Sequence, residues 1–314
     1  MSQTTAIIAG KLSTRRAYGE ALVKLGAANK EVVVLDAETS NSTFAELFKN
    51  QYPDRFIESY IAEQNMVSMA TGLSRMGKIP FVSTFAAFFS RAHDQIRMAQ
   101  YSHSNINFVG SHSGVSIGQD GSSQMAVEDL ALFRCILDSV VLYPCDKIST
   151  EKLVFKMAER KGVNYMRTTR ADTSILYSED EEFLIGGSKT LKESANDQVT
   201  VLAAGITLHE ALAAYENLQA ENISIRVVDL YSIKPIDKEV LAKACKETKA
   251  LIIVEDHYVE GGIYEAVCGS GVVTKPVHSL AVTKMSKSGT PEELMDLMQI
   301  DRKAIVDKVR GILG

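Results

Sequence analysis

The sequence predicts an α/β protein made of two doubly wound domains, and three observations support this. Short apolar runs of strand length alternate with amphipathic segments of helix length, which is the pattern of parallel α/β units. The alternation is interrupted by a polar stretch, residues 178–198, and then restarts. The length of 314 residues suits about two domains of roughly 100–200 residues each.

The first domain, residues 1–177, is expected to start with a helix that Ser13 or Thr14 caps and that runs to about Ala27. Residues 32–35 are all apolar, as in a strand that is buried on both faces. Further strands are predicted at Phe56–Tyr60, Pro80–Ser83, Ile106–Gly110, Val140–Tyr143 and Val163–Arg167, the last of which should complete this mostly parallel sheet. The helices between them are predicted near residues 64–76, 88–101, 126–133 and 149–161.

The polar stretch 178–198 is interpreted as a linker, because it combines an acidic run, the turn Gly186-Gly187 and a second polar run. A second, smaller α/β domain, residues 199–314, is predicted to follow it. Its strands are expected at Val199–Ala203, Ile225–Val228 and Leu251–Val254. Its helices are expected near residues 207–220, 237–247, 262–268, 290–298 and 301–312.

Composition excludes several classes of function. Apolar residues make up 46% of the chain and charged residues 23%, which is typical of a globular protein. The net charge of −5 comes without a basic block, so no nucleic-acid partner is expected. The N-terminal apolar run is too short for a secretory signal and no stretch is long enough to span a membrane, so we expect a cytoplasmic protein with no membrane partner. The four cysteines lack C-x-x-C spacing and are interpreted as reduced packing residues.

A candidate acid/base site begins at Glu63, which follows an apolar and aromatic strand. A carboxylate in apolar surroundings keeps a proton that it would lose in water, so it can share that proton with a ring nitrogen. The segment 84–89 supplies Phe85 and Phe88, whose rings could close over a flat heterocycle. Read alone, Glu63 could equally be an ordinary first-turn acid, and the two rings could be core residues.

A glycine-rich loop, residues 110–125, supplies candidate substrate residues. It lacks the G-K-[ST] ending of a P-loop and the G-x-G-x-x-G spacing of a dinucleotide fold, so both are rejected. His112, Asp120 and Gln124 are its candidate site residues. Gln124 can form hydrogen bonds with a hydroxyl but cannot carry a proton at neutral pH.

A phosphate pocket is predicted from residues in separate parts of the chain. Arginine offers a planar fork that pairs bidentately with phosphate, and a hydroxyl adds a neutral donor. The predicted set consists of Arg15, Ser42, His112 and Arg170.

The glutamate, the two rings and the glycine loop, in this order, resemble the pyrimidine-binding domain of transketolases. The resemblance extends from about Lys11 to the end of the chain and is greatest with the C-terminal half of animal-type transketolase. It implies a pyrimidine-binding-like domain followed by a smaller transketolase C-terminal-like domain. It also implies a thiamine-diphosphate-dependent transferase of the pentose phosphate pathway, which moves a two-carbon ketol unit from a ketose phosphate to an aldose phosphate.

The resemblance also implies a role for each candidate residue. Glu63 would bind the 1′ nitrogen of the aminopyrimidine, with Phe85 and Phe88 stacked on it or beside it. His112 would help hold the sugar phosphate, and Asp120 would accept a hydrogen bond from the C2 hydroxyl of the aldose. Gln124 stands at a position where bacterial and fungal members commonly have histidine. The implied catalytic set is Glu63, His112, Asp120 and Gln124. The implied cofactor-binding set is Glu63, Phe85, Phe88 and Gln124. Arg91, where many members have tyrosine, is interpreted as a structural residue in an ion pair.

The sequence lacks one signature of the family, a G-D-G followed some 25–30 residues later by Asn-Asn, which holds the diphosphate through a divalent metal. We therefore expect no metal ligand in this chain and interpret it as the C-terminal subunit of a split transketolase. A separate N-terminal subunit with the G-D-G and Asn-Asn motifs would share the thiamine diphosphate and a metal such as Mg²⁺, with a homodimer of this chain inside a heterotetramer. The alternatives are a subunit of a 1-deoxyxylulose-5-phosphate synthase-like or pentose-specific enzyme, and a regulatory partner without catalysis. Residues 255–257, Glu-Asp-His, have no function in this interpretation.

Overall fold

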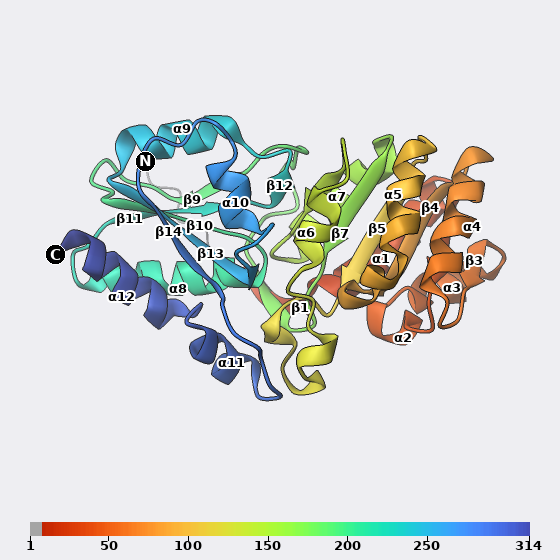
Figure 1. The fold of residues 1–314 in the computed structure, drawn as a ribbon, viewed down its shortest axis with the longest axis horizontal. Helices are drawn as coiled ribbons and strands as arrows, with labels where there is room; N and C mark the ends of the chain where they lie inside the picture. The colour runs from red at the N-terminus through yellow and green to blue at the C-terminus, as the bar shows by residue number, and fades with distance from the viewer. Residues whose placement is uncertain (1–7) are drawn as a thin grey trace.

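The chain folds into two α/β domains that lie side by side in the computed structural model, which describes residues 8–314 (Figure 1). The predicted fold class is confirmed. The first domain is built on a seven-stranded sheet whose neighbours are parallel except β12 with β6. In spatial order, its strands are β12 (Ser232–Lys234), β6 (Val140–Leu142), β7 (Val163–Arg167), β5 (Ile106–Ser111), β4 (Ile79–Phe85), β2 (Val32–Asp36) and β3 (Phe56–Glu58).

The second domain has a five-stranded sheet that is parallel except where β9 pairs with β11. In spatial order, its strands are β14 (Val277–Val282), β13 (Ala250–Tyr258), β10 (Val199–Ala203), β11 (Ile225–Asp229) and β9 (Lys189–Lys192). A two-stranded antiparallel ribbon, β1 (Ile8–Ser13) with β8 (Asp172–Ile175), lies where the domains meet. The α-helices of the second domain are α8 (Ile206–Ala220), α9 (Lys238–Glu247), α10 (Ile263–Cys268), α11 (Pro291–Met298) and α12 (Arg302–Leu313).

Helices cover both faces of each sheet, as in other doubly wound folds. The first domain has the α-helices α1 (Thr14–Ala28), α2 (Ser40–Thr43), α3 (Glu46–Gln51), α4 (Glu63–Arg75), α5 (His93–Tyr101), α6 (Asp129–Arg134) and α7 (Lys147–Glu159). It also has the 3₁₀ turns η1 (Pro53–Arg55), η2 (Ala86–Ala92), η3 (Val115–Asp120) and η4 (Ser122–Gln124). One apolar core joins α1 and α7 to α8 and α12, and a second joins α4 and α5 to α9 and α10, so each core layer crosses both domains.

Three sequence-based expectations about the elements were wrong. β7 does not complete the larger sheet, because β12, from the chain after the predicted linker, pairs with β6 at its edge. The stretch 178–198 is not all linker, because β9 takes its backbone hydrogen bonds from β11. The predicted helix near 88–101 is a 3₁₀ helix, η2, followed by α5.

Helix α1 begins where predicted, but without the expected cap. Ser13 occupies the N-cap position and makes no side-chain capping hydrogen bond. The Thr14 hydroxyl instead accepts the backbone N–H of Thr169 at 2.8 Å, which links α1 to the end of β7. In the part of the chain that the structure describes, no helix is both long enough and apolar enough to cross a membrane.

Candidate functional site

Most of the candidate residues lie at or beyond the carboxyl ends of β3, β2, β4, β5 and β7, five neighbouring parallel strands. Arg15 reaches the same place from the start of α1. Glu63 follows β3, Ser42 follows β2, and Arg170 follows β7. Phe85 is the last residue of β4 and His112 directly follows β5. In open α/β sheets, ligands bind at the carboxyl ends of the strands. The sheet order therefore gathers residues that are far apart in the sequence.

The two phenylalanines are stacked because of the local helix type. A 3₁₀ helix has three residues per turn, so side chains three positions apart eclipse one another. Phe85, the N-cap of η2, and Phe88 stack with ring centroids 5.2 Å apart and planes 10° from parallel. Arg91, three residues further on, places its guanidinium carbon 4.3 Å from the Phe88 ring centroid. At seven residues, η2 is longer than most 3₁₀ helices, and it holds two rings and a cation in one column.

Glu63 opens α4 with its side chain 4% exposed. Its Oε1 atom lies 2.5 Å from Nη1 of Arg91, a side chain that is 50% exposed. The ion pair interpreted for Arg91 is thus present. The sequence suggested purely apolar surroundings for Glu63. The structure differs, because the guanidinium of Arg91 contacts the carboxylate. The ion pair places the buried carboxylate of Glu63 beside the stacked rings of Phe85 and Phe88, the aromatic column.

His112 joins the aromatic column to a polar cluster. Its ring stacks on Phe85 with centroids 3.8 Å apart. Burial, and then the nearby Arg15 and Arg170, lower the pKa of His112 to about 3, so the imidazole is neutral at physiological pH. Its Nε2 atom lies 3.5 Å from Nη1 of Arg15 and its Nδ1 atom lies 2.9 Å from the Ser111 hydroxyl. Because arginine can only donate, this geometry favours the tautomer with the proton on Nδ1.

Two arginines and an aspartate lie near the buried ring of His112. Asp120 places one carboxylate oxygen 3.7 Å from Nη1 of Arg170 and the other 4.0 Å from Nε2 of His112. Arg170 also donates to the carbonyl of Ile117 at 3.0 Å. Burial, and then the charge of Arg170, lower the pKa of Arg15. The Nε atom of Arg15 is buried and has no hydrogen-bond partner among the described residues. The side chain of Arg170 is 38% exposed, so the cluster presents a donor that an anion could reach.

The remaining two candidates are placed less directly. Ser42 contributes its backbone carbonyl, which accepts a hydrogen bond from Arg15 at 2.8 Å. Gln124 ends the turn η4, and within residues 8–314 its side chain forms no hydrogen bond with the other candidates. In the same part of the chain, no group of three or more His, Cys, Asp or Glu side chains could hold a metal ion.

Sequence reasoning missed Asp36, which shapes the loop that carries Ser42. Asp36 ends β2 fully buried, and its carboxylate accepts the Thr39 N–H at 2.6 Å and the Thr43 hydroxyl at 2.8 Å. Burial raises the pKa of Asp36 to about 7, against the opposing effect of these hydrogen bonds. The available signal was an aspartate at the end of a buried strand with a threonine three residues later, which is an Asx-turn pattern.

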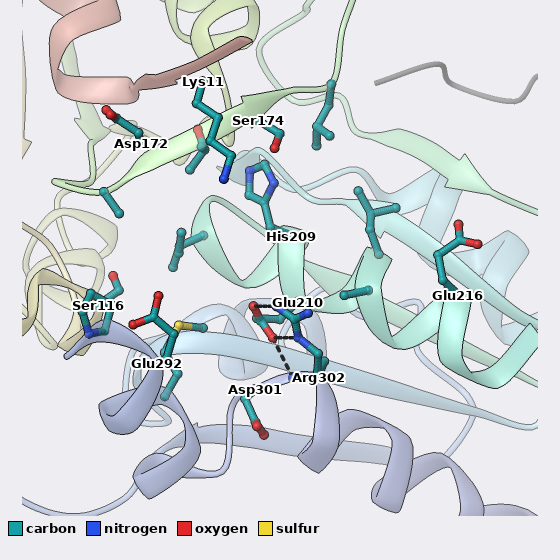
Figure 2. Close-up of a pocket in the computed structure, with 18 of the residues that line it drawn as sticks. Lys11, Ser116, Asp172, Ser174, His209, Glu210, Glu216, Glu292, Asp301 and Arg302 are labelled. Atoms are coloured by element: carbon teal, nitrogen blue, oxygen red, sulfur yellow. Dashed lines mark hydrogen bonds and ion pairs between the residues drawn. The ribbon is translucent and has the colours of Figure 1, made fainter. Parts of the chain in front are cut away.

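A separate cavity of about 740 Å³ lies between the domains and contains none of the predicted site residues. Figure 2 shows Lys11 extending from β1 towards His209 of α8, with Ser116 of η3 on another wall. Glu210 and Arg302 form an ion pair at 2.8 Å in the same wall as α8. The cavity borders the back of the glycine-rich loop through Ser116.

Comparisons with known proteins show the family to which the two domains belong. The family model described as transketolase, pyrimidine binding domain matches residues 10–174, and the one described as transketolase, C-terminal domain matches residues 188–305. The chain is 53% identical over 311 residues to transketolase of Homo sapiens, a match that covers 98% of this chain and 50% of that protein. It is 52% identical to transketolase-like protein 1 of Bos taurus, covering 98% of this chain and 52% of that protein. The chain thus spans about half the length of the curated relatives it matches.

Two solved structures are similar along nearly the whole chain. A structure described as "Split gene transketolase, inactive beta4 tetramer" matches with a TM-score of 0.87 and 38% identity, covering 96% of this chain and 98% of that chain. The transketolase of Campylobacter jejuni matches with a TM-score of 0.84 and 19% identity, covering 99% of this chain and 48% of that chain, which supports the fold.

Proposed function

Because this chain belongs to the transketolase family and carries its pyrimidine-binding and C-terminal domains, we propose that it is the C-terminal subunit of a split transketolase. The observation that carries the proposal is the near end-to-end match to the split-gene structure, which covers 96% of this chain and 98% of that one. The reaction is transfer of a two-carbon ketol unit from a ketose phosphate to an aldose phosphate. We place it in the sugar-phosphate metabolism of the cytoplasm, in the pentose phosphate pathway.

The aromatic column and Glu63 fit the aminopyrimidine of thiamine diphosphate. Such a ring needs a planar apolar surface and a group that shares a proton with a ring nitrogen, and the site offers the rings of Phe85 and Phe88 beside the buried carboxyl group of Glu63. When bound, the cofactor supplies the carbon nucleophile and the electron sink of the reaction. Glu63 would hold or share a proton at its carboxylate oxygen. Arg91 keeps that carboxylate oriented through their 2.5 Å ion pair.

The polar cluster fits the sugar phosphates. Arg15 and Arg170 would bind the phosphate through charge-assisted hydrogen bonds, with the partly exposed side chain of Arg170 as one accessible donor. His112 is neutral, so it would bind as a hydrogen-bonding group and add no charge. Asp120 would accept a hydrogen bond from the C2 hydroxyl of the aldose. Gln124 would bind a sugar hydroxyl, or the cofactor, from the turn that follows.

A partner subunit completes the proposed enzyme. It would carry the G-D-G and Asn-Asn motifs, the Mg²⁺ and the diphosphate of the cofactor. Tyr60 and Ile61, just before Glu63, are 68% and 76% exposed. Adjacent large apolar side chains that are exposed in this way are typical of a surface that another chain covers. The split-gene relative is described as an inactive beta4 tetramer, which supports self-association of this chain. We propose a homodimer of this chain within a heterotetramer.

Reconstitution tests the proposal. Calorimetry should detect no tight binding of thiamine diphosphate to this chain with Mg²⁺, because most of the cofactor's charge is in its diphosphate. Addition of a G-D-G subunit should restore tight binding and ketol transfer, and omission of Mg²⁺ should abolish both. Full turnover by this chain alone would disprove the proposal of a split enzyme. A reconstituted complex without ketol transfer would disprove the proposed reaction.

A further inference from the structure

The Glu255-Asp256-His257 segment of β13 has no role in the proposed reaction, yet all three side chains are buried. Glu255 accepts the backbone N–H groups of Ile263 and Tyr264 at 2.5 and 3.1 Å, at the start of α10. The His257 ring binds the adjacent carbonyl of Tyr258 at 2.6 Å. These two contacts stay within the second domain. His257 also lies 3.9 Å from Asp129 of the first domain, through its Nε2 atom. Asp256 differs, because its carboxylate accepts backbone N–H groups of the first domain.

Asp256 caps the glycine-rich loop from the other domain. Its carboxylate accepts the backbone N–H of Val115 at 2.7 Å and that of Ser116 at 3.3 Å, the first two residues of η3. The N-cap residue of η3 is Gly114, which has no side chain and a φ of +78°. A Cβ atom on Gly114 would lie 2.1 Å from Oδ2 of Asp256. The carboxylate thus stands where an N-cap side chain would satisfy the free N–H groups of the first turn.

Other parts of the second domain hold the rest of this loop. A Cβ atom on Gly118 would lie 3.1 Å from the carbonyl oxygen of Gly289, and one on Gly121 would lie 3.0 Å from the Ser288 hydroxyl. Arg170 donates to Ile117 in the middle of η3. The loop is therefore packed between the strand end that bears Asp256, the turn before α11, and an arginine of the phosphate cluster.

The 3₁₀ segment η3 ends at Asp120, whose carboxylate lies near Arg170 and His112. We infer that Asp256, in the second domain, is a positioning residue: it fixes η3 so that Asp120 and Arg170 face the aldose phosphate. The inference rests on the proposed function of this site.

The charge environment supports an acceptor at this position. Arg167, fully buried on β7, donates to the backbone carbonyl of Asp256 at 2.8 Å and so anchors β13 beside the loop. Burial raises the pKa of Asp256, while Arg167 and the loop N–H groups oppose that rise. An ionised carboxylate accepts from both N–H groups. An asparagine would accept from one and turn its NH₂ group towards the other.

The test compares two half-reactions in the enzyme reconstituted with its G-D-G partner. Asp256→Asn should raise the KM for the aldose phosphate acceptor about tenfold or more, because Asp120 and Arg170 are displaced. Single-turnover consumption of hydroxypyruvate without acceptor should stay within about twofold of wild type, because that donor carries no phosphate and needs no acceptor contact. Asp237→Ala is the matched control: Asp237 also accepts two backbone N–H groups, of Glu239 and Val240 at 3.1 Å, but caps α9 far from the loop in sequence. It should leave both half-reactions unchanged.

A second measurement follows the loop itself. Asparagine keeps an acceptor for one of the two N–H groups. Backbone amide exchange of the other, at Val115 or Ser116, should therefore be at least about tenfold faster in Asp256→Asn than in wild type. Equal loss in both half-reactions, no change in the acceptor KM, or unchanged exchange would each overturn the inference. If Asp256→Asn does not fold, Gly114→Ala, which displaces the same carboxylate from the loop side, replaces it. A wild-type complex without ketol transfer would refute the proposed function alone, because amide exchange needs no activity.

Discussion

At Glu63, one carboxylate faces both a cation and an aromatic column. Arg91 pairs with it at 2.5 Å and also covers the Phe88 ring, so the same guanidinium joins the proposed acid/base group to the proposed stacking surface. Arg91 is half exposed, whereas Glu63 is buried.

Substitution of Glu63 tests its role in proton sharing. Glu63→Gln preserves size but cannot hold the proton, so turnover of the reconstituted enzyme should fall by about 10²–10⁴. Glu31→Gln, which breaks only a surface pair with Lys78, is the control and should retain wild-type turnover. Steady-state kinetics and circular dichroism provide the measurement. Near-full activity of Glu63→Gln with the fold intact would remove Glu63 from the mechanism.

The phosphate cluster gives a prediction about selectivity. Arg170→Ala should lower kcat/KM for a phosphorylated aldose by roughly ten- to a hundredfold, because a charge-assisted hydrogen bond of about 1.5–3 kcal/mol is lost. The unphosphorylated acceptor glycolaldehyde should be affected much less. Arg16→Ala, which loses an exposed pair with Glu20, is the control. Equal losses on both acceptors would show that Arg170 shapes the site without selecting phosphate.

At the scale of elements, the helix starts show how local and distant contacts combine. Asp146 caps α7 in a capping box with Ser149, accepting its N–H at 2.8 Å. The other oxygen of Asp146 accepts the N–H groups of Leu176 and Tyr177 at 2.8 and 3.1 Å. One buried carboxylate thus holds both a helix start and the segment that leaves β8. Asp301 caps α12 more simply, through the Ala304 N–H at 2.9 Å.

Because Asp146 accepts more backbone N–H groups than Asp301, the two capping residues should contribute differently to the free energy of unfolding. Asp301→Ala should lower the free energy of unfolding by about 1 kcal/mol, the usual cost of a lost N-cap. Asp146→Ala should lower it by at least about 3 kcal/mol, because two further buried N–H groups are left without acceptors. Urea unfolding of this chain measures both. Similar losses in the two variants would show that water replaces Asp146 at Leu176 and Tyr177.

At the scale of the whole molecule, the two domains share their core and their edge strands. β12 completes the larger sheet from the other side of the linker, and both core layers cross the boundary. A buried carboxyl also lies at this boundary. Asp229, at the end of β11, accepts the Tyr177 hydroxyl at 2.7 Å and the Cys145 thiol at 3.4 Å. Burial raises the pKa of Asp229 to about 7 from an ordinary value of 3.8.

The raised pKa of Asp229 makes stability depend on pH. Between about pH 4 and 7 the folded chain keeps a proton that the unfolded chain has lost, so the free energy of unfolding decreases as pH rises, by up to about 1.4 kcal/mol per pH unit from this group. Asp229→Asn cannot titrate and should show a smaller decrease over that window, measured by urea unfolding at several pH values. Asp54→Asn, on the surface turn η1, should keep the wild-type slope. An unchanged slope in Asp229→Asn would show that this carboxyl is ionised in the folded protein.

The sequence by itself determined the fold class, the main helices and the buried strands. The spacing of apolar residues and the local backbone preference depend on residues that are consecutive in the sequence, as in the unbroken apolar run 32–35. The sequence also named the side chains that the structure gathers at the carboxyl ends of the strands. All of them except Arg15, which lies in the first predicted helix, are at or after the end of a predicted strand. Their roles in binding and catalysis remain our proposals.

Only the tertiary structure decided the elements and contacts that depend on distant partners. β9 and β12 are short and polar, and they are strands because β11 and β6 complete their hydrogen bonds. The stack of Phe85 on His112 and the cap that Asp256 gives to η3 join residues 27 and more than 100 positions apart. No local pattern specifies such pairs, since the free energy that fixes them comes from burial and hydrogen bonding across the folded chain.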